Sequence, residues 1–146
     1  MKTAAQFFKV LADDARLRIL WLLFNHEELC VCDFMAALEI TQSKASRHLS
    51  TLRHAKLVTD RKEGLWSYYA LCPSDDALER QHLALLRETL ARRPDSKPLL
   101  TKLHNWLNAK DRNAACTTGG ACERAPSGPS KARSATRRTS RKGGSR

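Results

Sequence analysis

The chain has 146 residues, which suits one domain of ordinary size with an appendage and is short for two full domains. Its 42% apolar and 28% charged residues are typical of a globular protein, and its net charge of +11 suits a phosphate-rich partner, either nucleic acid or an anionic membrane surface. No stretch approaches the roughly 20 apolar residues of a membrane span, and the first ten residues lack the apolar core of a secretory signal. We therefore expect a cytoplasmic protein with no membrane partner.

The composition changes abruptly near residue 111. Five of the six glycines follow that point, and residues 111–146 carry nine Lys and Arg against two Asp and Glu. Residues 124–146 hold eight of these cations and no acid, mixed with Ser, Thr, Pro and Gly, a composition typical of disorder. We predict a folded domain over residues 1–110 and a disordered basic tail over residues 111–146, which either solubilises the protein or binds phosphate as a non-specific arm.

Two amphipathic helices are predicted in the first 25 residues. The first covers residues 3–12, and the second begins after Asp13, a suitable N-cap, and ends near Asn25. Apolar side chains in both recur with the i, i+3, i+4, i+7 spacing of a helix that packs one face on a core. These side chains are Ala4, Phe7, Phe8 and Leu11 in the first helix and Leu17, Leu20, Trp21 and Phe24 in the second.

A helix-turn-helix is predicted next, from a short helical run over residues 34–38, a tight joint over residues 39–41 and a helix over residues 42–54 capped by Thr41. The start of the second helix of such a motif lies in the major groove of DNA. Its polar face offers side chains suited to base edges, namely Gln42, Ser43, Ser46 and Arg47, and two suited to phosphates, namely Lys44 and His48.

A two-stranded hairpin is predicted over residues 56–71, with turn residues at 62–64. Arg61 and Lys62 at its tip are placed to hold the DNA backbone beside the minor groove. Further helical stretches are predicted over residues 75–90 and 99–107, separated by a break at Pro94–Pro98. A solvated helix face would need no partner, but the helix-turn-helix together with a basic hairpin favours DNA binding.

Cys30 and Cys32 lie at the start of the first helix of the predicted motif. The helix dipole and the free N–H groups there favour thiolate over thiol, and thiolates select soft ions. Two sulfurs one residue apart can reach a single small centre. The alternative is that both cysteines are small buried apolar residues, as cysteines often are.

Three segments resemble the ArsR/SmtB family of winged-helix metal-sensing repressors, in the family's order: Leu-Ala-Asp-Asp-Ala-Arg-Leu-Arg-Ile-Leu over residues 11–20, Glu-Leu-Cys-Val-Cys-Asp over 28–33 and Gln-Ser-Lys-Ala-Ser-Arg-His-Leu over 42–49. The resemblance implies a mainly α fold with a β-hairpin wing, and a homodimer formed by the first helix and the helix after the hairpin. It assigns Cys30 and Cys32 to sensing trivalent arsenic or antimony. The family often has a further cysteine three residues on, where this chain has Met35, so the third ligand stays open among Cys116, Cys122, Cys72, water and a small thiol.

The function expected from these residues and this resemblance is a repressor that binds double-stranded operator DNA as a dimer without a cofactor. Binding of As(III) or Sb(III) to Cys30 and Cys32 would release it. The alternative is a repressor of the same fold that responds to thiol oxidation or to another soft metal. His82 lacks the Asp two residues earlier that zinc sensors of the family use, because Arg80 stands there. No nucleophile beside a base and no glycine-rich phosphate loop is evident, so we do not expect an enzyme.

Overall fold

The computed structural model describes residues 1–113, with side chains as far as Lys110, so the predictions for the basic tail, Cys116 and Cys122 lie outside the described residues. This part of the chain has six helices and a small antiparallel sheet, which confirms the predicted fold class. In chain order the elements are α1 (Lys2–Leu11), α2 (Asp14–Asn25), β1 (Leu29–Cys30), α3 (Val31–Leu38), α4 (Gln42–His54), β2 (Val58–Glu63), β3 (Trp66–Leu71), α5 (Ala77–Ala91) and α6 (Ser96–Asn113).

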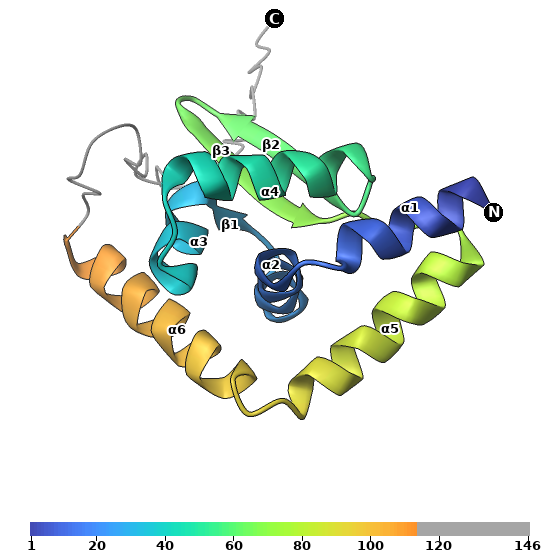
Figure 1. The fold of residues 1–146 in the computed structure, drawn as a ribbon. Coiled ribbons are helices and arrows are strands. Elements are labelled where there is room, and N and C mark those ends of the chain that lie inside the picture. Colours follow the sequence, from blue (N-terminus) through green and yellow to red (C-terminus); the bar gives the residue numbers. More distant parts are fainter. Residues whose placement is uncertain (114–146) are drawn as a thin grey trace, which may run out of the picture.

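Helix α2 lies at the centre of the domain, with the other helices arranged around it (Figure 1). Its Ile19, Leu20 and Leu22 are fully buried, as expected for a helix covered on several faces. The predicted cap is confirmed, because the Asp13 carboxylate accepts a hydrogen bond from the backbone N–H of Arg16 at 3.1 Å.

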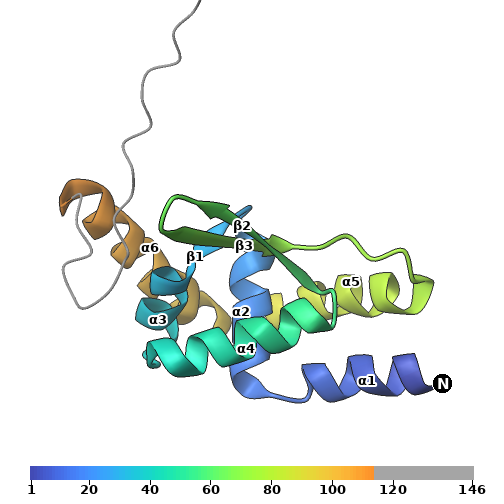
Figure 2. The same ribbon diagram turned by 90° about the horizontal axis from the view of Figure 1, so that it is seen from above.

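Helices α3 and α4 form the predicted helix-turn-helix and pack against each other (Figure 2). Glu39 ends α3 in the left-handed conformation (φ 56°), and its N–H donates to the carbonyl of Met35. The Thr41 side chain then caps α4 by accepting from the N–H of Lys44. The apolar face of α4 is buried in the core through Ala45, Leu49 and Leu52.

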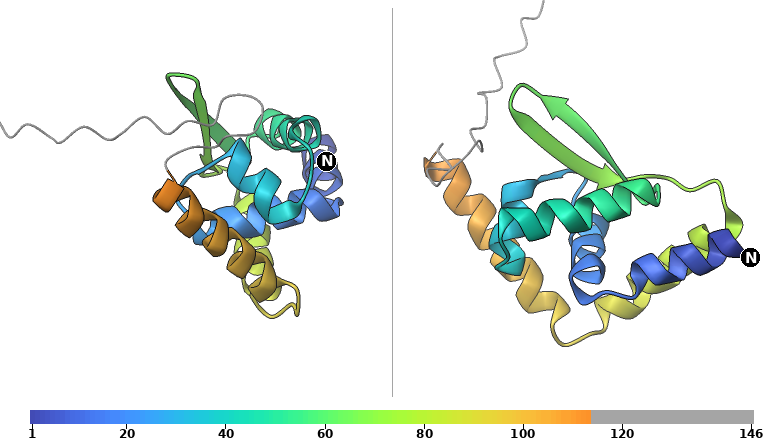
Figure 3. Two further views of the ribbon diagram at one scale, coloured as in Figure 1. Left: turned by 90° about the vertical axis from the view of Figure 1, so that its left-hand side faces the viewer. Right: turned by 45° about the horizontal axis from the view of Figure 1, so that its top comes forward.

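The sheet has three strands in the order β1-β3-β2, whereas the sequence predicted only the hairpin. Leu29 pairs with Tyr69, and Cys30 pairs with Tyr68. Of the predicted turn at 62–64, only Gly64 (φ 62°) is confirmed: β2 continues to Glu63, which pairs with Trp66, and Gly64 and Leu65 form the turn. The hairpin projects from the helical body as a wing (Figure 3).

Helices α5 and α6 form the two arms of a V around α2, with α1 beside α5 and α3 beside α6 (Figure 1). The predicted break is shorter than expected, because α6 already begins at Ser96 and holds Pro98 in its first turn, where a missing N–H costs no helical hydrogen bond. No helix within residues 1–113 is both long and apolar enough to cross a membrane.

Candidate DNA interface and thiol site

The polar face of α4 is open to solvent where a helix-turn-helix contacts DNA. Five of the six α4 residues predicted to contact DNA are exposed: Gln42, Ser43, Lys44, Ser46 and Arg47. The apolar residues on the opposite side are fully buried, which fixes the direction of the polar face. The arrangement presents amide, hydroxyl and guanidinium groups together at the helix start, and these are the groups that read base edges.

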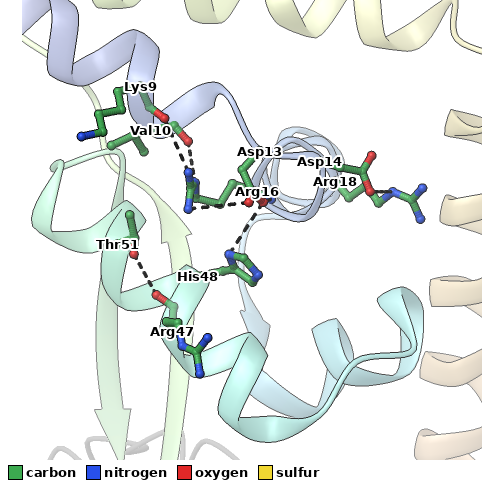
Figure 4. A network of polar contacts seen from close by, with 9 residues as sticks. All are labelled: Lys9, Val10, Asp13, Asp14, Arg16, Arg18, Arg47, His48 and Thr51. Carbon is green, nitrogen blue, oxygen red and sulfur yellow. Dashed lines mark hydrogen bonds and ion pairs between the residues drawn. The ribbon is translucent and has the colours of Figure 1, made fainter.

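The sixth residue, His48, faces inward. Its side chain is only 19% exposed, and its Nδ1 lies 3.7 Å from Asp13 Oδ1. Figure 4 shows His48 directed at Asp13, whereas Arg47 points away from it. The same Asp13 carboxylate accepts from the N–H of Arg16, whose guanidinium also donates to the carbonyls of Val10 and Lys9 at the end of α1. His48 therefore contacts the α1–α2 junction, where the sequence predicted a phosphate contact.

An open concavity of about 410 Å³ lies between α1 and α4 beside this face. It is lined by Gln6, Arg47, Ser50, Thr51, His54 and Ala55. The Arg47 guanidinium is the charged group among these residues and suits a phosphate group. Ser50 belongs to α4 itself, whereas only the packing of α1 on the domain brings Gln6 to the same place.

On the wing, Arg61 and Lys62 lie on β2, and both are exposed. The Arg61 guanidinium binds Glu28 through two hydrogen bonds of 2.9 and 3.1 Å and Glu63 through one of 2.7 Å. It also lies 4.9 Å from the ring centre of Tyr68. Arg61 therefore links the wing to the residues just before β1, and a phosphate would compete with two carboxylates for it.

Cys30 occupies two structural positions at once, as the last residue of β1 and the N-cap of α3. Its N–H donates to Asp33 Oδ2 at 2.9 Å, and its sulfur accepts from the Asp33 N–H, which makes a reciprocal capping box. Cys32 follows in the first turn of α3 and is half-buried. Both cysteines pack in one small cluster with Trp66 and Tyr68 of β3.

Helix α6 completes this site with two side chains that the sequence did not single out. Trp106 Nε1 donates to Asp33 Oδ1 at 3.0 Å, and Lys110 Nζ donates to the same oxygen at 3.0 Å. Lys110 Nζ also lies 3.1 Å from the sulfur of Cys30. Asp33 is only 4% exposed, so this carboxylate and the Lys110 ammonium form a buried ion pair.

The thiolate expected at Cys30 is not favoured in this arrangement. Burial raises the pKa of Cys30, and the negative charge of Asp33 raises it further, while Lys110 and the Asp33 N–H act in the opposite direction. The prediction from the helix dipole alone was wrong in its net direction, because it ignored burial. Burial by itself would lower the pKa of Lys110, but Asp33 and Cys30 outweigh it and raise that pKa.

Two other sets of residues have side chains of the kind that bind metal ions. Within residues 1–113, no group of three or more His, Cys, Asp or Glu side chains could hold a metal ion, so the structure does not add Cys72 to the cysteine pair. His26 and His104 are 78 positions apart in the sequence, but their ring centres lie only 5.3 Å apart. The other candidate third ligands in the chain, Cys116 and Cys122, lie outside the described residues.

A helix-turn-helix with an exposed polar recognition helix and a hairpin wing defines a winged-helix regulator. Residues 13–60 match the arsR family of bacterial regulatory proteins, and the chain belongs to this family. The family and its relatives are transcriptional regulators rather than enzymes. This finding confirms the resemblance drawn from the three sequence segments.

The arsenical resistance operon repressor of Escherichia coli strain K12 is 53% identical over 68 residues, which cover 47% of this chain and 58% of that protein. The matched segment spans little more than half of the curated relatives' length. HlyU from Vibrio cholerae N16961 has a similar structure, with a TM-score of 0.54, 32% identity, and coverage of 62% of this chain and 95% of that chain. The homodimeric winged helix-turn-helix domain of Mb0332 from Mycobacterium bovis aligns with a TM-score of 0.53 and 29% identity, over 64% of this chain and 82% of that chain.

Proposed function

We propose that this chain represses transcription by binding operator DNA as a homodimer and that it leaves the operator when As(III) or Sb(III) binds Cys30 and Cys32. Similarity to an arsenical resistance operon repressor supports an arsenical as the inducer. The observation that carries the proposal is the double position of Cys30, which belongs to the wing sheet and caps the helix that supports α4.

DNA contact is assigned to α4 and the wing. Gln42, Ser43, Ser46 and Arg47 read base edges, and Lys44 and Lys62 contact phosphates. Arg61 contacts a phosphate of the DNA only when that phosphate displaces Glu28 and Glu63 from its guanidinium. The concavity beside Arg47 adds a further place for the DNA backbone.

The dimer face is assigned to α1 and α5, which lie side by side on one flank of the domain (Figure 3). Phe8 on α1 is 45% exposed and Leu85 on α5 is 58% exposed, although both are large apolar residues. Burial of this flank against a second copy would place two α4 helices on one side of the dimer for two half-sites. The homodimeric Mb0332 domain supports this assembly.

Release follows from where the sulfurs lie. The reaction requires Cys30 and Cys32 in their reduced form, which the thiols of a reducing compartment maintain. Each of these thiols then gives its proton to a hydroxide of arsenous acid, which leaves as water, and two such steps place both sulfurs on one centre. Cys30 must then move from the cap of α3, and its pairing with Tyr68 of β3 and its hydrogen bond to Asp33 transmit the movement to the wing and to the support of α4. A coupling of only about 1.4 kcal/mol lowers operator affinity tenfold.

The test is an operator titration by fluorescence anisotropy with and without As(III), Sb(III), Zn(II) and Cd(II). Cys30→Ser and Cys32→Ser should each keep operator affinity within about threefold, because neither residue lies on the polar face of α4, but should lose release by As(III). Cys72→Ser is the matched control, since it removes a thiol outside the pair, and should respond like the wild type.

Three results would contradict the proposal in different ways. Release of a Cys30→Ser, Cys32→Ser double variant at wild-type arsenite concentrations would remove the pair from sensing. Release of the wild type by Zn(II) or Cd(II) but not by As(III) would show that the inducer is a divalent metal ion instead of a metalloid. Release by diamide without any metalloid would favour a redox-responsive repressor, although a disulfide across one intervening residue is strained.

A further inference from the structure

Helix α6 reaches the thiol site from beyond the segment that matches the family, which ends at residue 60. Trp106 and Lys110 both hydrogen-bond Asp33, and Lys110 also contacts the sulfur of Cys30. We call Asp33, Trp106 and Lys110 the α6 clamp. These contacts join residues 73 to 80 positions apart, so they tie the end of the domain to the cap of α3.

The Asp33 carboxylate of the clamp is buried and fully engaged, while Trp106 and Lys110 are half-buried. The side chains of Lys110 and Asp33 are only 12% and 6% exposed. One Asp33 oxygen accepts from Trp106 and Lys110, and the other accepts from the N–H of Cys30. A buried charge pair of this kind strongly resists the loss of one partner, so it holds Cys30 in one arrangement.

Helix α6 is also held along its length, so the clamp acts on a fixed element. At its start, the carbonyl of Ser96 accepts a hydrogen bond from Trp21 Nε1 at 3.0 Å. Leu99 and Leu103 are buried in the core between the two ends. Figure 1 shows α6 extending from its junction with α5 and lying beside α3.

We propose that the α6 clamp opposes inducer binding, because it keeps Cys30 in the buried arrangement that is competent for DNA and must open before the cysteine pair can bind As(III). This inference rests on the function proposed above. Trp106 and Lys110 are thus positioning residues that raise the inducer concentration needed for release.

The direction of the effect follows from the surroundings of Cys30. The residue is only 1% exposed, so an incoming metalloid cannot reach its sulfur without a rearrangement. When the Cys30 sulfur bonds arsenic, its proton leaves in a water molecule. The sulfur then also moves away from Lys110. The free energy needed to open the clamp is subtracted from inducer affinity, and a weaker clamp therefore increases that affinity.

The first test compares Trp106→Phe with Trp21→Phe in the full chain bound to operator. Each variant keeps an aromatic ring and removes one indole hydrogen bond that holds α6. Trp21 donates to Ser96 at the start of α6, whereas Trp106 lies on α6 and donates to Asp33. We expect Trp106→Phe to lower the As(III) concentration for half-release about threefold and to leave metalloid-free operator affinity within about twofold. Trp21→Phe should keep the wild-type concentration.

The second test compares two lysines of α6 that bind α3. Lys110 binds its N-terminal cap, whereas Lys102 Nζ binds Glu39 at its C-terminal end at 2.8 Å. Lys110→Met and Lys102→Met remove the same charge, but only the first opens the clamp. We expect a lower half-release concentration for Lys110→Met alone. If circular dichroism shows that Trp106→Phe does not fold, the comparison of Lys110→Met with Lys102→Met tests the clamp in its place.

A third measurement needs no DNA. Amide hydrogen exchange over residues 106–110 should become faster in the wild type when As(III) is added, and should not change in Cys30→Ser. Clamp variants that release at the same concentration as their controls, or at a higher one, would overturn the inference, as would unchanged exchange in wild-type protein that binds As(III). Failure of As(III) to release the wild type is a separate outcome, which contradicts the proposed function instead.

Discussion

Arg47 and His48 follow one another on α4, but their side chains face different surroundings (Figure 4). Arg47 is exposed and lines the concavity between α1 and α4. His48 is mostly buried and lies against Asp13, which caps α2. Arg47 is therefore placed to contact DNA, whereas His48 supports the helix that carries Arg47.

Replacing Arg47 by Ala should weaken operator binding by about 1 to 3 kcal/mol, because the variant has no guanidinium to bind a base or phosphate. The free energy of unfolding should stay within about 0.5 kcal/mol of the wild type, since the side chain is exposed. Lys97→Ala, which removes an exposed cation from the first turn of α6, is the control. Equal operator affinity in Arg47→Ala and Lys97→Ala would exclude Arg47 from the contact set.

Replacing His48 by Gln should have the opposite profile. Without the imidazole beside Asp13, the free energy of unfolding should fall by about 1 kcal/mol in urea denaturation, while operator affinity and its salt dependence change little. If instead operator affinity falls with a shallower salt slope and stability is unchanged, the phosphate contact predicted from the sequence is correct.

At the scale of elements, the wing carries two neighbouring cations with different partners. Arg61 is held by Glu28 and Glu63, while Lys62 on the same strand is exposed to solvent. Salt bridges at an exposed surface contribute little to stability, but they do compete with phosphate for the same guanidinium. The two positions offer a matched comparison, because each variant removes one charge from β2.

We expect Lys62→Ala to reduce the slope of log K against log salt by about 0.9, the value for one phosphate contact, and Arg61→Ala to reduce it by less. The measurement is operator binding at several salt concentrations. A larger reduction of the slope in Arg61→Ala than in Lys62→Ala would show that DNA displaces both glutamates from Arg61.

The elements that the sequence predicted are those with strong local signals. Asp13 and Thr41 mark helix starts because their side chains cap the next turn, and the apolar spacing in α4 shows which face is buried. Strand β1 was missed because two residues carry no pattern, and its formation depends on pairing with Tyr68 and Tyr69 far along the chain.

The thiol site also has some residues that the sequence predicted and others that only the structure revealed. The short Cys-x-Cys spacing made Cys30 and Cys32 candidates without a structure. Asp33, Trp106 and Lys110 come together only through the packing of α6 on α3, across 73 or more residues, and an isolated Trp or Lys on a predicted helix gives no sign of such a contact. The direction of the pKa shift of Cys30 depends on this same packing.

At the scale of the whole molecule, Leu85→Asp tests the proposed dimer face. Because Leu85 is exposed in the single chain, the variant should fold, but two buried carboxylates across a symmetric interface should weaken dimerisation at least tenfold. Leu65→Asp at the wing tip, where Leu65 is 84% exposed, is the control and should dimerise like the wild type. Sedimentation profiles that agree for the two variants would place the dimer interface elsewhere.

The basic tail over residues 124–146 lies outside the described residues, and its eight cations lead to a prediction from charge alone. Deleting it should reduce non-specific DNA affinity and make the slope of log K against log salt shallower, by about 0.9 for each phosphate that the tail binds in the wild type. A full-length variant with these eight Lys and Arg changed to Gln keeps the length of the tail and should show the same reduction. If both variants keep the wild-type slope, the tail does not contact phosphate; if only the deletion makes the slope shallower, the charge of the tail is not the cause.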